Sequence, residues 1–215
     1  MAKIKRNRNG TRKDVIITKA AKLFREKGFS ATSMRDLAEH VGVEAASLYN
    51  HISSKAEILQ EICFKTANNF MSHIEEVDAT PNKTAIEKIQ AILRFHIKQM
   101  LDNYEEVYVS DREWKHLTDP YLSNMQSQRR AYRQRIALVI EEGIRRGEIK
   151  PIDAPTAVLI MLHAISGIES WHRSKKKIPG ELLEDNMVQI LVDGLRKQAL
   201  FFTKNLPFWL RIFIN

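Results

Sequence analysis

The sequence predicts an all-α protein of about nine helices, in which an N-terminal three-helix head with a helix-turn-helix precedes a larger C-terminal helical bundle. Along most of the chain, apolar residues recur every three or four positions, as on one face of a helix. The 215 residues include only eight glycines and six prolines, too few for the closely spaced turns of an all-β fold. The apolar content of 44% allows a sizeable core. The length fits one large domain, or one small and one medium domain.

The first two helices are predicted from apolar stripes and their stop signals. Residues 12–27 place apolar side chains on one face and charges on the other. Gly28 follows the last periodic residue, as glycine commonly does after a helix. Ser33 is placed to cap a second helix over about residues 34–41, with Asp36 as its capping-box partner.

Gly42 interrupts this pattern, and a third, very short helix is expected over about residues 45–51. It can bury Leu48 and Ile52, but its polar end, Tyr49-Asn50-His51, has no obvious core to fill. Two short helices joined through a glycine have the spacing of a helix-turn-helix. In that motif the second helix enters the major groove of DNA, and only its first turns need to reach the bases.

The remaining helices form the predicted body. Ser53 or Ser54 caps a fourth helix, which should run to a break at residues 80–82. Asp119 and Pro120 should act as the N-cap and first residue of a long helix. We expect helices over about residues 84–103, 105–117, 120–146, 154–172 and 181–197.

Positive charge is concentrated at the start of the chain. Residues 1–55 contain 12 Lys and Arg but only 5 Asp and Glu, whereas residues 56–215 contain 22 and 21. Nearly all of the net charge of +8 therefore lies in the first quarter. This distribution favours a module that binds a polyanion, attached to a neutral body. The alternative is that the first cations, Lys3, Lys5, Arg6 and Arg8, form only a solvated tail.

Several classes of protein are not supported. Cys63 is the only cysteine, so a disulfide framework is excluded, and its place on an apolar stripe suggests a core residue. The seven histidines form no His-x-x-x-His pair, so we expect no metal site, and we expect no cofactor. There is no glycine-rich phosphate loop or nucleophile elbow, so we do not expect an enzyme. No signal peptide or membrane-spanning stretch is seen, which favours a cytoplasmic protein.

Nearly fifty residues at the start of the chain form a specific signature. Its segments are Ala20–Phe24, Gly28–Phe29, Thr32–Met34, Leu37–Ala38, Val41–Val43, Ser47–His51 and Lys55–Leu59. In these segments the sequence resembles the tetracycline-repressor-like (TetR) family of bacterial transcriptional regulators. The resemblance implies a nucleoid-associated homodimer with a DNA-binding domain at residues 1–56 and a ligand-binding and dimerisation domain at 57–215. Most such proteins repress transcription until a small molecule releases them.

The chemistry of the third helix suggests how it would bind double-stranded DNA. Tyr49 and Asn50 can hold phosphate oxygens, whereas the small Ala45, Ala46 and Ser47 let the backbone approach the base edges. A homodimer would then require a near-palindromic operator. His51-Ile52 stands where many members have His-Phe, a mild departure. Asn50 is a candidate DNA contact on this chemistry alone. The resemblance indicates further DNA contacts at Thr32, Ser33, Arg35, Ala45, Ala46, Ser47, Tyr49, His51 and Lys55.

The body resembles one branch of the family more loosely, through residues 141–149, Asp153, residues 168–173 and Leu195. That branch contains repressors of fatty-acid and steroid catabolism that sense acyl-CoA thioesters. An acyl tail needs an apolar tunnel, and CoA phosphates need arginine or lysine. Candidate tail contacts are Phe64, Phe70, Phe95, Met100, Tyr108, Trp114, Tyr132, Met161 and Trp171, and candidate head-group contacts are Arg129, Arg130 and Arg133.

Each of these residues has a simpler interpretation. Aromatic and methionine residues at helical spacing usually belong to the core, and the arginines fit a solvated helix face or the rim of a dimer contact. The alternative function is a DNA-binding regulator without a small-molecule ligand, which is constitutive or controlled by a protein partner. A filled body would favour that alternative, whereas a cavity of several hundred cubic ångströms would favour a sensor.

The last two predicted helices would pair with their symmetry mates, as the resemblance implies. The apolar tail, residues 201–215, could pack on the body or across the dimer, touch a membrane surface or form an unstructured end. The candidate interface residues are Ala157, Leu159, Ile160, Leu162, Ala164, Ile165, Ile190, Leu191 and Leu195.

Overall fold

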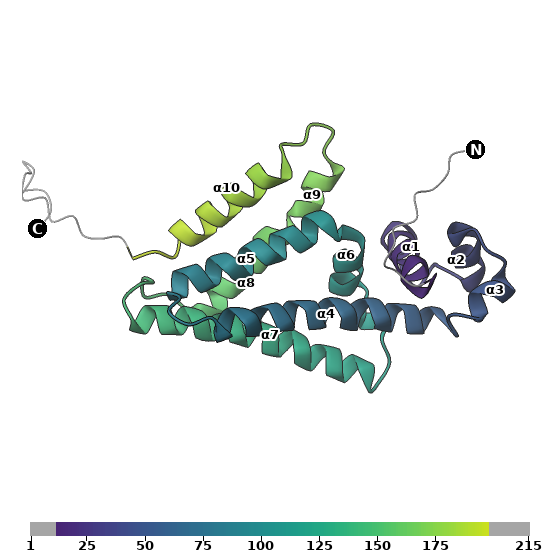
Figure 1. Ribbon diagram of the computed structural model, residues 1–215, viewed down its shortest axis with the longest axis horizontal. Helices are drawn as coiled ribbons and strands as arrows, with labels where there is room; N and C mark the ends of the chain where they lie inside the picture. Colours follow the sequence, from purple (N-terminus) through teal and green to yellow (C-terminus); the bar gives the residue numbers. More distant parts are fainter. Residues whose placement is uncertain (1–11, 198–215) are drawn as a thin grey trace, which may run out of the picture.

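The computed structural model describes residues 12–197, and the all-α prediction is confirmed over this range (Figure 1). The cations at positions 3–8 and the apolar tail at 201–215 lie outside the described residues. The helices are α1 Arg12–Lys27, α2 Met34–Val41, α3 Ala45–Tyr49, α4 Lys55–Ala79, α5 Ala85–Asp102, α6 Tyr104–Arg112, the 3₁₀ helix η1 Trp114–His116, α7 Tyr121–Arg145, α8 Ala154–Ser166, α9 Ile168–Arg173 and α10 Gly180–Asp193.

The predicted caps of α2 and α4 and the glycines after α1 and α2 are confirmed, whereas the third helix ends at Tyr49 rather than near residue 51. The hydroxyl of Ser33 accepts a hydrogen bond from the Asp36 N–H (3.1 Å), and the Asp36 carboxylate accepts one from the Ser33 N–H (2.8 Å). Gly28 and Gly42 have φ angles of +84° and +81°, a conformation that L side chains rarely adopt. Ser54 caps α4 through its hydroxyl.

Helix α4 contributes to both parts of the molecule. Figure 1 shows α1, α2 and α3 gathered at its N-terminal end, and α5, α6 and α7 pack against the rest of its length. Leu59 and Ile62 belong to the core formed with α1–α3, whereas Phe70 and Ile74 belong to the core of the body. Because α4 is continuous from Lys55, it joins the two cores rigidly.

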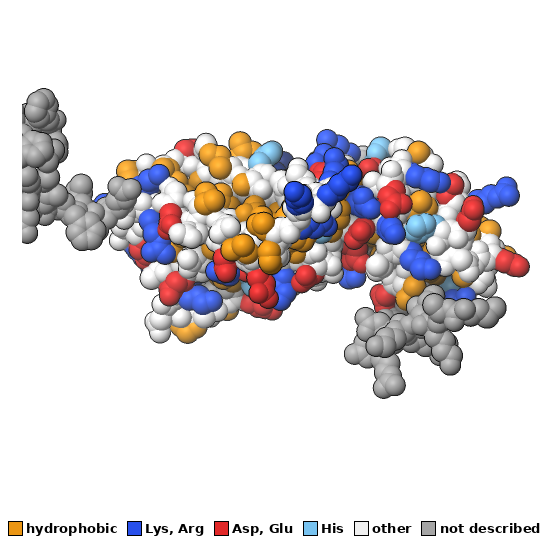
Figure 2. Space-filling view, turned by 90° about the horizontal axis from the view of Figure 1, so that it is seen from above, with side chains coloured by type: hydrophobic (Ala, Val, Ile, Leu, Met, Phe, Trp, Pro, Cys, Tyr) orange, Lys and Arg blue, Asp and Glu red, His pale blue; other side chains and the backbone are white. Residues whose placement is uncertain are grey.

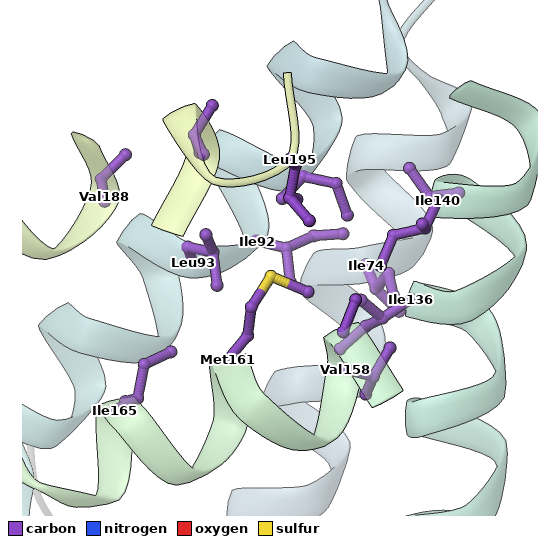
Figure 3. Close-up of a cluster of buried hydrophobic side chains, with 14 of the residues drawn as sticks. Ile74, Ile92, Leu93, Ile136, Ile140, Val158, Met161, Ile165, Val188 and Leu195 are labelled. Carbon is purple, nitrogen blue, oxygen red and sulfur yellow. The ribbon is translucent and has the colours of Figure 1, made fainter. Parts of the chain in front are cut away.

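The body core lies between α4, α5, α7, α8 and α10. Figure 3 shows side chains from these helices meeting in one buried cluster, in which Met161 of α8 points towards Ile92 and Leu93 of α5. Ile74, Ile140 and Ile165 are fully buried. This part of the body is filled by aliphatic side chains.

Three of the predicted body helices are shorter than expected. The helix predicted over about residues 105–117 ends at Arg112, and residues 114–116 form the separate 3₁₀ helix η1. The helix predicted to reach residue 172 is interrupted at Gly167, where the Ser166 hydroxyl donates to the Leu162 carbonyl (3.0 Å), a contact that bends helices. Helix α10 ends at Asp193 before Gly194. The chain then pairs with the segment after α7, because the Lys150 N–H donates to the Leu195 carbonyl (3.0 Å).

The start of α7 also differs by one residue. Pro120 is the N-cap rather than the first helical residue, and α7 begins at Tyr121. Asp119 still satisfies an N–H of the first turn, because its carboxylate accepts hydrogen bonds from the backbone N–H (3.1 Å) and hydroxyl (2.6 Å) of Ser123.

We predict that Gly143→Ala destabilises the body. An added Cβ would lie 2.6 Å from Ile149 Cδ1 and 2.7 Å from Ala85 Cβ. The overpacking cost of about 1–3 kcal/mol exceeds the gain in helix propensity of up to about 1 kcal/mol. Denaturant unfolding should therefore show a net loss. Gly180→Ala is the control, because its Cβ would be 3.4 Å from Leu101; equal stability of the two variants would contradict the prediction.

Candidate DNA-binding head and ligand cavity

Helix α3 turns most of its side chains to solvent. Leu48 is its only buried residue, and Ile52 just beyond it is also buried. Tyr49 is 53% exposed, and Ala45, Ala46, Asn50 and His51 are exposed as well, while Ser47 is half-buried. The short helix is therefore anchored by two aliphatic side chains and presents its polar end outward. This geometry allows contact with a large partner such as a DNA groove.

The turn between α2 and α3 is fixed by backbone hydrogen bonds. The Gly42 N–H donates to the carbonyls of Ala38 (2.9 Å) and Glu39 (3.1 Å), and the Val43 N–H also donates to Ala38 (3.0 Å). The Lys19 ammonium donates to the Val41 carbonyl (2.8 Å) and so ties α1 to the end of α2. The angle between α2 and α3 is therefore held by satisfied backbone groups.

Two of the residues predicted to contact DNA are engaged inside the head. Thr32 is buried, and its hydroxyl donates to the Gly28 carbonyl (2.8 Å). The Lys55 ammonium donates to the carbonyls of Phe29 (2.9 Å), Ser30 (3.3 Å) and Thr32 (2.8 Å), and lies 4.6 Å from the centre of the Phe29 ring. The turn before α2 leaves these carbonyls without helical partners, so the side chains of Thr32 and Lys55 serve the turn.

The described part of the head is less basic than the whole first quarter of the chain. Residues 12–55 contain eight Lys and Arg and five Asp and Glu. Lys13 forms ion pairs with Glu57 (3.1 Å) and Glu61 (2.5 Å) of α4. Ser33 and Arg35, which are also predicted DNA contacts, are exposed at the start of α2.

A cavity of about 360 Å³ lies in the body between α4, α5, α6, η1, α7 and α8. Its inner wall is apolar and aromatic, with Phe70, Met100 and Tyr132 among the lining residues. The candidates from the sequence that line it are Phe70, Met100, Trp114, Arg129, Tyr132 and Arg133.

The other candidate ligand residues are placed elsewhere by their packing. Met161 is buried in the aliphatic core, as Figure 3 shows. Phe95 stacks on His73 (ring centres 4.0 Å apart). Phe64 packs against Tyr121, and Tyr108 packs against Tyr104. The indole N–H of Trp171 donates to the Ile178 carbonyl. Arg130 is exposed and does not line the cavity.

The rim of the cavity carries charge. Arg129 donates to the Asp111 carboxylate (2.7 Å) and lies over the Trp114 ring (5.3 Å to its centre). Lys115 and Arg133 are exposed at the rim. Sequence reasoning missed Lys115 because its helix, η1, is too short to show periodicity. The cavity thus combines an apolar interior with three cationic groups and one carboxylate.

His96 is a titratable residue of the cavity wall that is half-buried overall and has a buried Nδ1 atom. Its ring packs against Phe70 (4.4 Å between centres) and near Tyr132 (6.2 Å). Burial lowers the pKa of His96 to about 4. The nearby Asp111 carboxylate raises this pKa by a smaller amount, and the Arg129 guanidinium lowers it slightly further. The imidazole is therefore neutral at physiological pH. Sequence reasoning considered the histidines only as metal ligands and so overlooked this one.

The short helix η1 contacts both the cavity and the head. Trp114 and Lys115 line the cavity. The flanking Glu113 carboxylate accepts a hydrogen bond from the Phe29 N–H (3.4 Å), and the His116 ring stacks on the Phe29 ring (5.5 Å between centres). Phe29 belongs to the turn before α2 that Lys55 also holds. A displacement of η1 would therefore move Phe29 directly, and Phe29 lies in the turn that leads into the helix-turn-helix.

An apolar face remains exposed on α8 and α10. Leu159, Ile160 and Ile190 are 55%, 57% and 71% exposed. Figure 2 shows hydrophobic side chains gathered on the face of the body that carries α10, beside lysine and arginine side chains over the turn between α9 and α10. Ala157, Ile165 and Leu195, which were also predicted for a dimer contact, are buried in the core of their own subunit.

Other sites that were considered find no support among the described residues. No three His, Cys, Asp or Glu side chains in residues 12–197 are grouped closely enough to hold a metal ion. Within the same range, no helix is both long and apolar enough to cross a membrane. Cys63 is buried as predicted, and burial raises the pKa of its thiol to about 12.

Comparison with known proteins gives matches over both parts of the chain. Residues 16–62 match the family described as "Bacterial regulatory proteins, tetR family", and residues 82–195 match "Tetracyclin repressor-like, C-terminal domain". The HTH-type transcriptional repressor KstR2 of Mycobacterium tuberculosis is 23% identical over 192 residues, which are 88% of this chain and 95% of that protein.

Solved structures share the fold. The ketosteroid transcriptional regulator KstR2 of Mycobacterium tuberculosis superimposes with a TM-score of 0.81 at 21% identity, covering 89% of this chain and 98% of that one. AibR, in complex with isovaleryl coenzyme A and operator DNA, gives a TM-score of 0.73 at 23% identity and covers 85% and 98%.

We predict that His96 makes the protein less stable in mild acid. Because its pKa is near 4 in the folded state and about 6.5 when unfolded, the unfolded chain binds more protons between these values, and stability falls as the pH drops through this range. Between pH 7.5 and 5, denaturant unfolding of the wild type should lose about 2 kcal/mol more than that of His96→Phe. An NMR titration giving a His96 pKa above 6 would contradict this.

Proposed function

The chain belongs to the tetracycline-repressor (TetR) family of bacterial regulatory proteins, and on that premise we propose that it is a homodimeric, sequence-specific DNA-binding repressor released by a small apolar or acyl-CoA-type ligand. The observation that carries the proposal is the position of η1. This short helix lines the cavity with Trp114 and Lys115 and contacts the head through Glu113 and His116. The cavity and the DNA-binding head are thereby adjacent.

DNA binding is assigned to the exposed side of α3 and the start of α2. Tyr49 and Asn50 would bind phosphates, and Ala45, Ala46 and Ser47 would approach the base edges. We place the functional division at residue 56, with DNA binding before it and ligand binding and dimerisation after it. The proposed location is the bacterial cytoplasm, where the operator DNA lies.

Dimerisation is assigned to the exposed apolar face of α8 and α10. Leu159, Ile160 and Ile190 have large exposed side chains, and contiguous exposed apolar surface commonly marks an interaction site. A two-fold dimer through this face would present two copies of α3 to successive turns of the duplex. A near-palindromic operator follows from that symmetry.

The charge distribution of the cavity supports an amphipathic effector. An acyl or ring system would contact Phe70, Met100 and Tyr132 in the apolar interior. Lys115 and Arg133 at the rim could bind phosphate groups. AibR, which has the same fold, was solved with isovaleryl coenzyme A and operator DNA, and the relative KstR2 is described as a ketosteroid regulator. The AibR complex favours a CoA thioester as the ligand class, and the description of KstR2 is in keeping with an apolar ring system in the buried part of the effector.

Release would proceed through η1. A ligand that displaces Trp114 or Lys115 moves the same three-residue helix that carries His116 and adjoins Glu113. Those two residues contact the Phe29–Ser30 turn, which precedes α2. The ligand can shift the equilibrium between DNA-binding and released states only if it binds one of them more tightly.

For DNA binding, we predict different effects for phosphate and base contacts. Tyr49→Ala should weaken binding to all duplexes about tenfold, because a lost phosphate contact carries no sequence preference. Ser47→Ala should change the order of preference among operator variants. Mobility-shift titrations at fixed salt test both. Tyr121→Ala, which removes another exposed tyrosine, is the control. Unchanged binding by Tyr49→Ala would refute the assignment of α3.

For the ligand, we predict that a medium-chain acyl-CoA releases operator DNA in a mobility-shift assay. Replacing both Lys115 and Arg133 with glutamine should raise the concentration needed by about tenfold or more, because charge-assisted hydrogen bonds to the CoA phosphates are lost. Arg130→Gln is the matched control, since Arg130 is exposed on the same helix as Arg133 but does not line the cavity. Failure of every acyl-CoA to release the wild type would remove this ligand class.

A further inference from the structure

Two polar atoms in the cavity wall have no hydrogen-bond partner in the described protein. Three buried side-chain nitrogen or oxygen atoms in residues 12–197 lack a partner: His96 Nδ1, Gln128 Oε1 and Arg25 Nε. Arg25 Nε lies 3.8 Å from a Glu105 carboxylate oxygen, so its charge is compensated. The other two residues both line the cavity. Unpaired buried polar groups are costly and uncommon, so their presence together in one cavity requires a reason.

His96 packs against a residue of α7, the helix that also carries Gln128. Tyr132 lies one helical turn after Gln128 on α7, and its ring centre is 6.2 Å from that of His96 on α5. Both Tyr132 and His96 also pack against Phe70, at 5.6 Å and 4.4 Å between ring centres. The imidazole is thus set among aromatic rings, where water competes poorly for hydrogen bonds.

The chemistry of each atom restricts what can pair with it. The Gln128 amide nitrogen donates to Asn124 Oδ1 (3.4 Å), which leaves Oε1 as an acceptor that needs a donor. His96 is neutral, so Nδ1 either donates or accepts, according to its tautomer. A single group that can donate and accept satisfies both residues.

We propose that His96 and Gln128 recognise an uncharged group that both donates and accepts hydrogen bonds, an alcohol hydroxyl or a secondary amide, in the buried part of the effector. This inference rests on the proposed function only in taking the cavity as the effector site. A hydrocarbon would leave both atoms unpaired. A carboxylate would meet the Gln128 oxygen without a proton to share. In the unliganded protein, solvent would occupy these hydrogen bonds, and the effector would replace it.

Three probes of similar shape test the donor requirement directly. 2-Naphthol carries a donor and acceptor, 2-methoxynaphthalene keeps only the acceptor, and naphthalene has neither. Isothermal titration calorimetry on the wild type should show that 2-naphthol binds about tenfold or more tightly than the other two. Equal affinities for the three probes, or binding by none of them, would overturn the inference. This comparison needs no variant, so it does not depend on a mutant folding.

Variants then assign the preference to a residue. Gln128→Leu should abolish the advantage of 2-naphthol while leaving the affinity for naphthalene unchanged or improved. Its melting temperature should equal or exceed that of the wild type, because an unpaired buried acceptor is removed; a merely structural glutamine would lower it. Gln126→Leu, an exposed glutamine on the same helix, should retain the preference. Retention of the preference in Gln128→Leu would count against the proposal.

Acyl-CoA esters distinguish the two sources of the group. If the acyl chain supplies it, 3-hydroxydecanoyl-CoA should release DNA at about tenfold lower concentration than decanoyl-CoA, and Gln128→Leu should close the gap. If a pantetheine amide supplies it, the two esters should act alike, and both should weaken about tenfold in Gln128→Leu. Equal action of both esters on wild type and variant would refute the proposal. If neither ester releases DNA, the proposed ligand class fails, whereas the naphthol comparison still decides this inference.

Discussion

The turn that precedes the helix-turn-helix is held by one ammonium group. The carbonyls of Phe29, Ser30 and Thr32 all accept hydrogen bonds from Lys55, which is the first residue of α4. Because α4 continues into the body, this contact sets the position of α2 and α3 relative to the rest of the subunit. Glu113 and His116 also contact the first residue of this turn, Phe29. This turn is therefore contacted by two elements of the body, the long helix α4 and the short helix η1 that lines the cavity.

The body contains two kinds of buried surface, a filled aliphatic core and a cavity with unpaired polar atoms. Its aliphatic core is filled, as Ile74, Ile92 and Ile165 illustrate, and it supplies stability without chemical selectivity. The cavity instead keeps polar atoms of His96 and Gln128 unpaired. Such groups lower the stability of the folded state, and proteins commonly retain costs of this kind at functional sites. The packing thus separates the part of the body that stabilises from the part that can recognise a ligand.

Local signals in the sequence were sufficient for most of the fold. Ser33, Gly42 and Ser54 end or begin helices through contacts within a few residues, so their patterns can be read directly. The interruption at Gly167 was missed because the apolar period continues on either side of it. The end of α10 was missed because residues 194–197 pair with a segment almost fifty residues earlier, a contact that leaves no periodic trace.

The candidate sites show the same limit. The exposed residues of α3 could be predicted because a short helix with two apolar anchors has few faces. The internal contacts of Thr32 and Lys55 could not, since they depend on carbonyls left free by the tertiary turn. In the body, only six of the twelve candidate residues line the cavity. The sequence could not separate them from the other six, because aromatic residues at helical spacing look alike whether they face a packed core or a cavity.

Leu159 belongs both to the cavity wall and to the exposed apolar face of α8. Any second subunit that covers this face also covers the outer side of one wall of the cavity. Occupancy and assembly would then be thermodynamically linked: whatever factor subunit association applies to effector affinity, the effector must apply to association. The dose of effector needed for induction would accordingly depend on how much of the protein the cell contains.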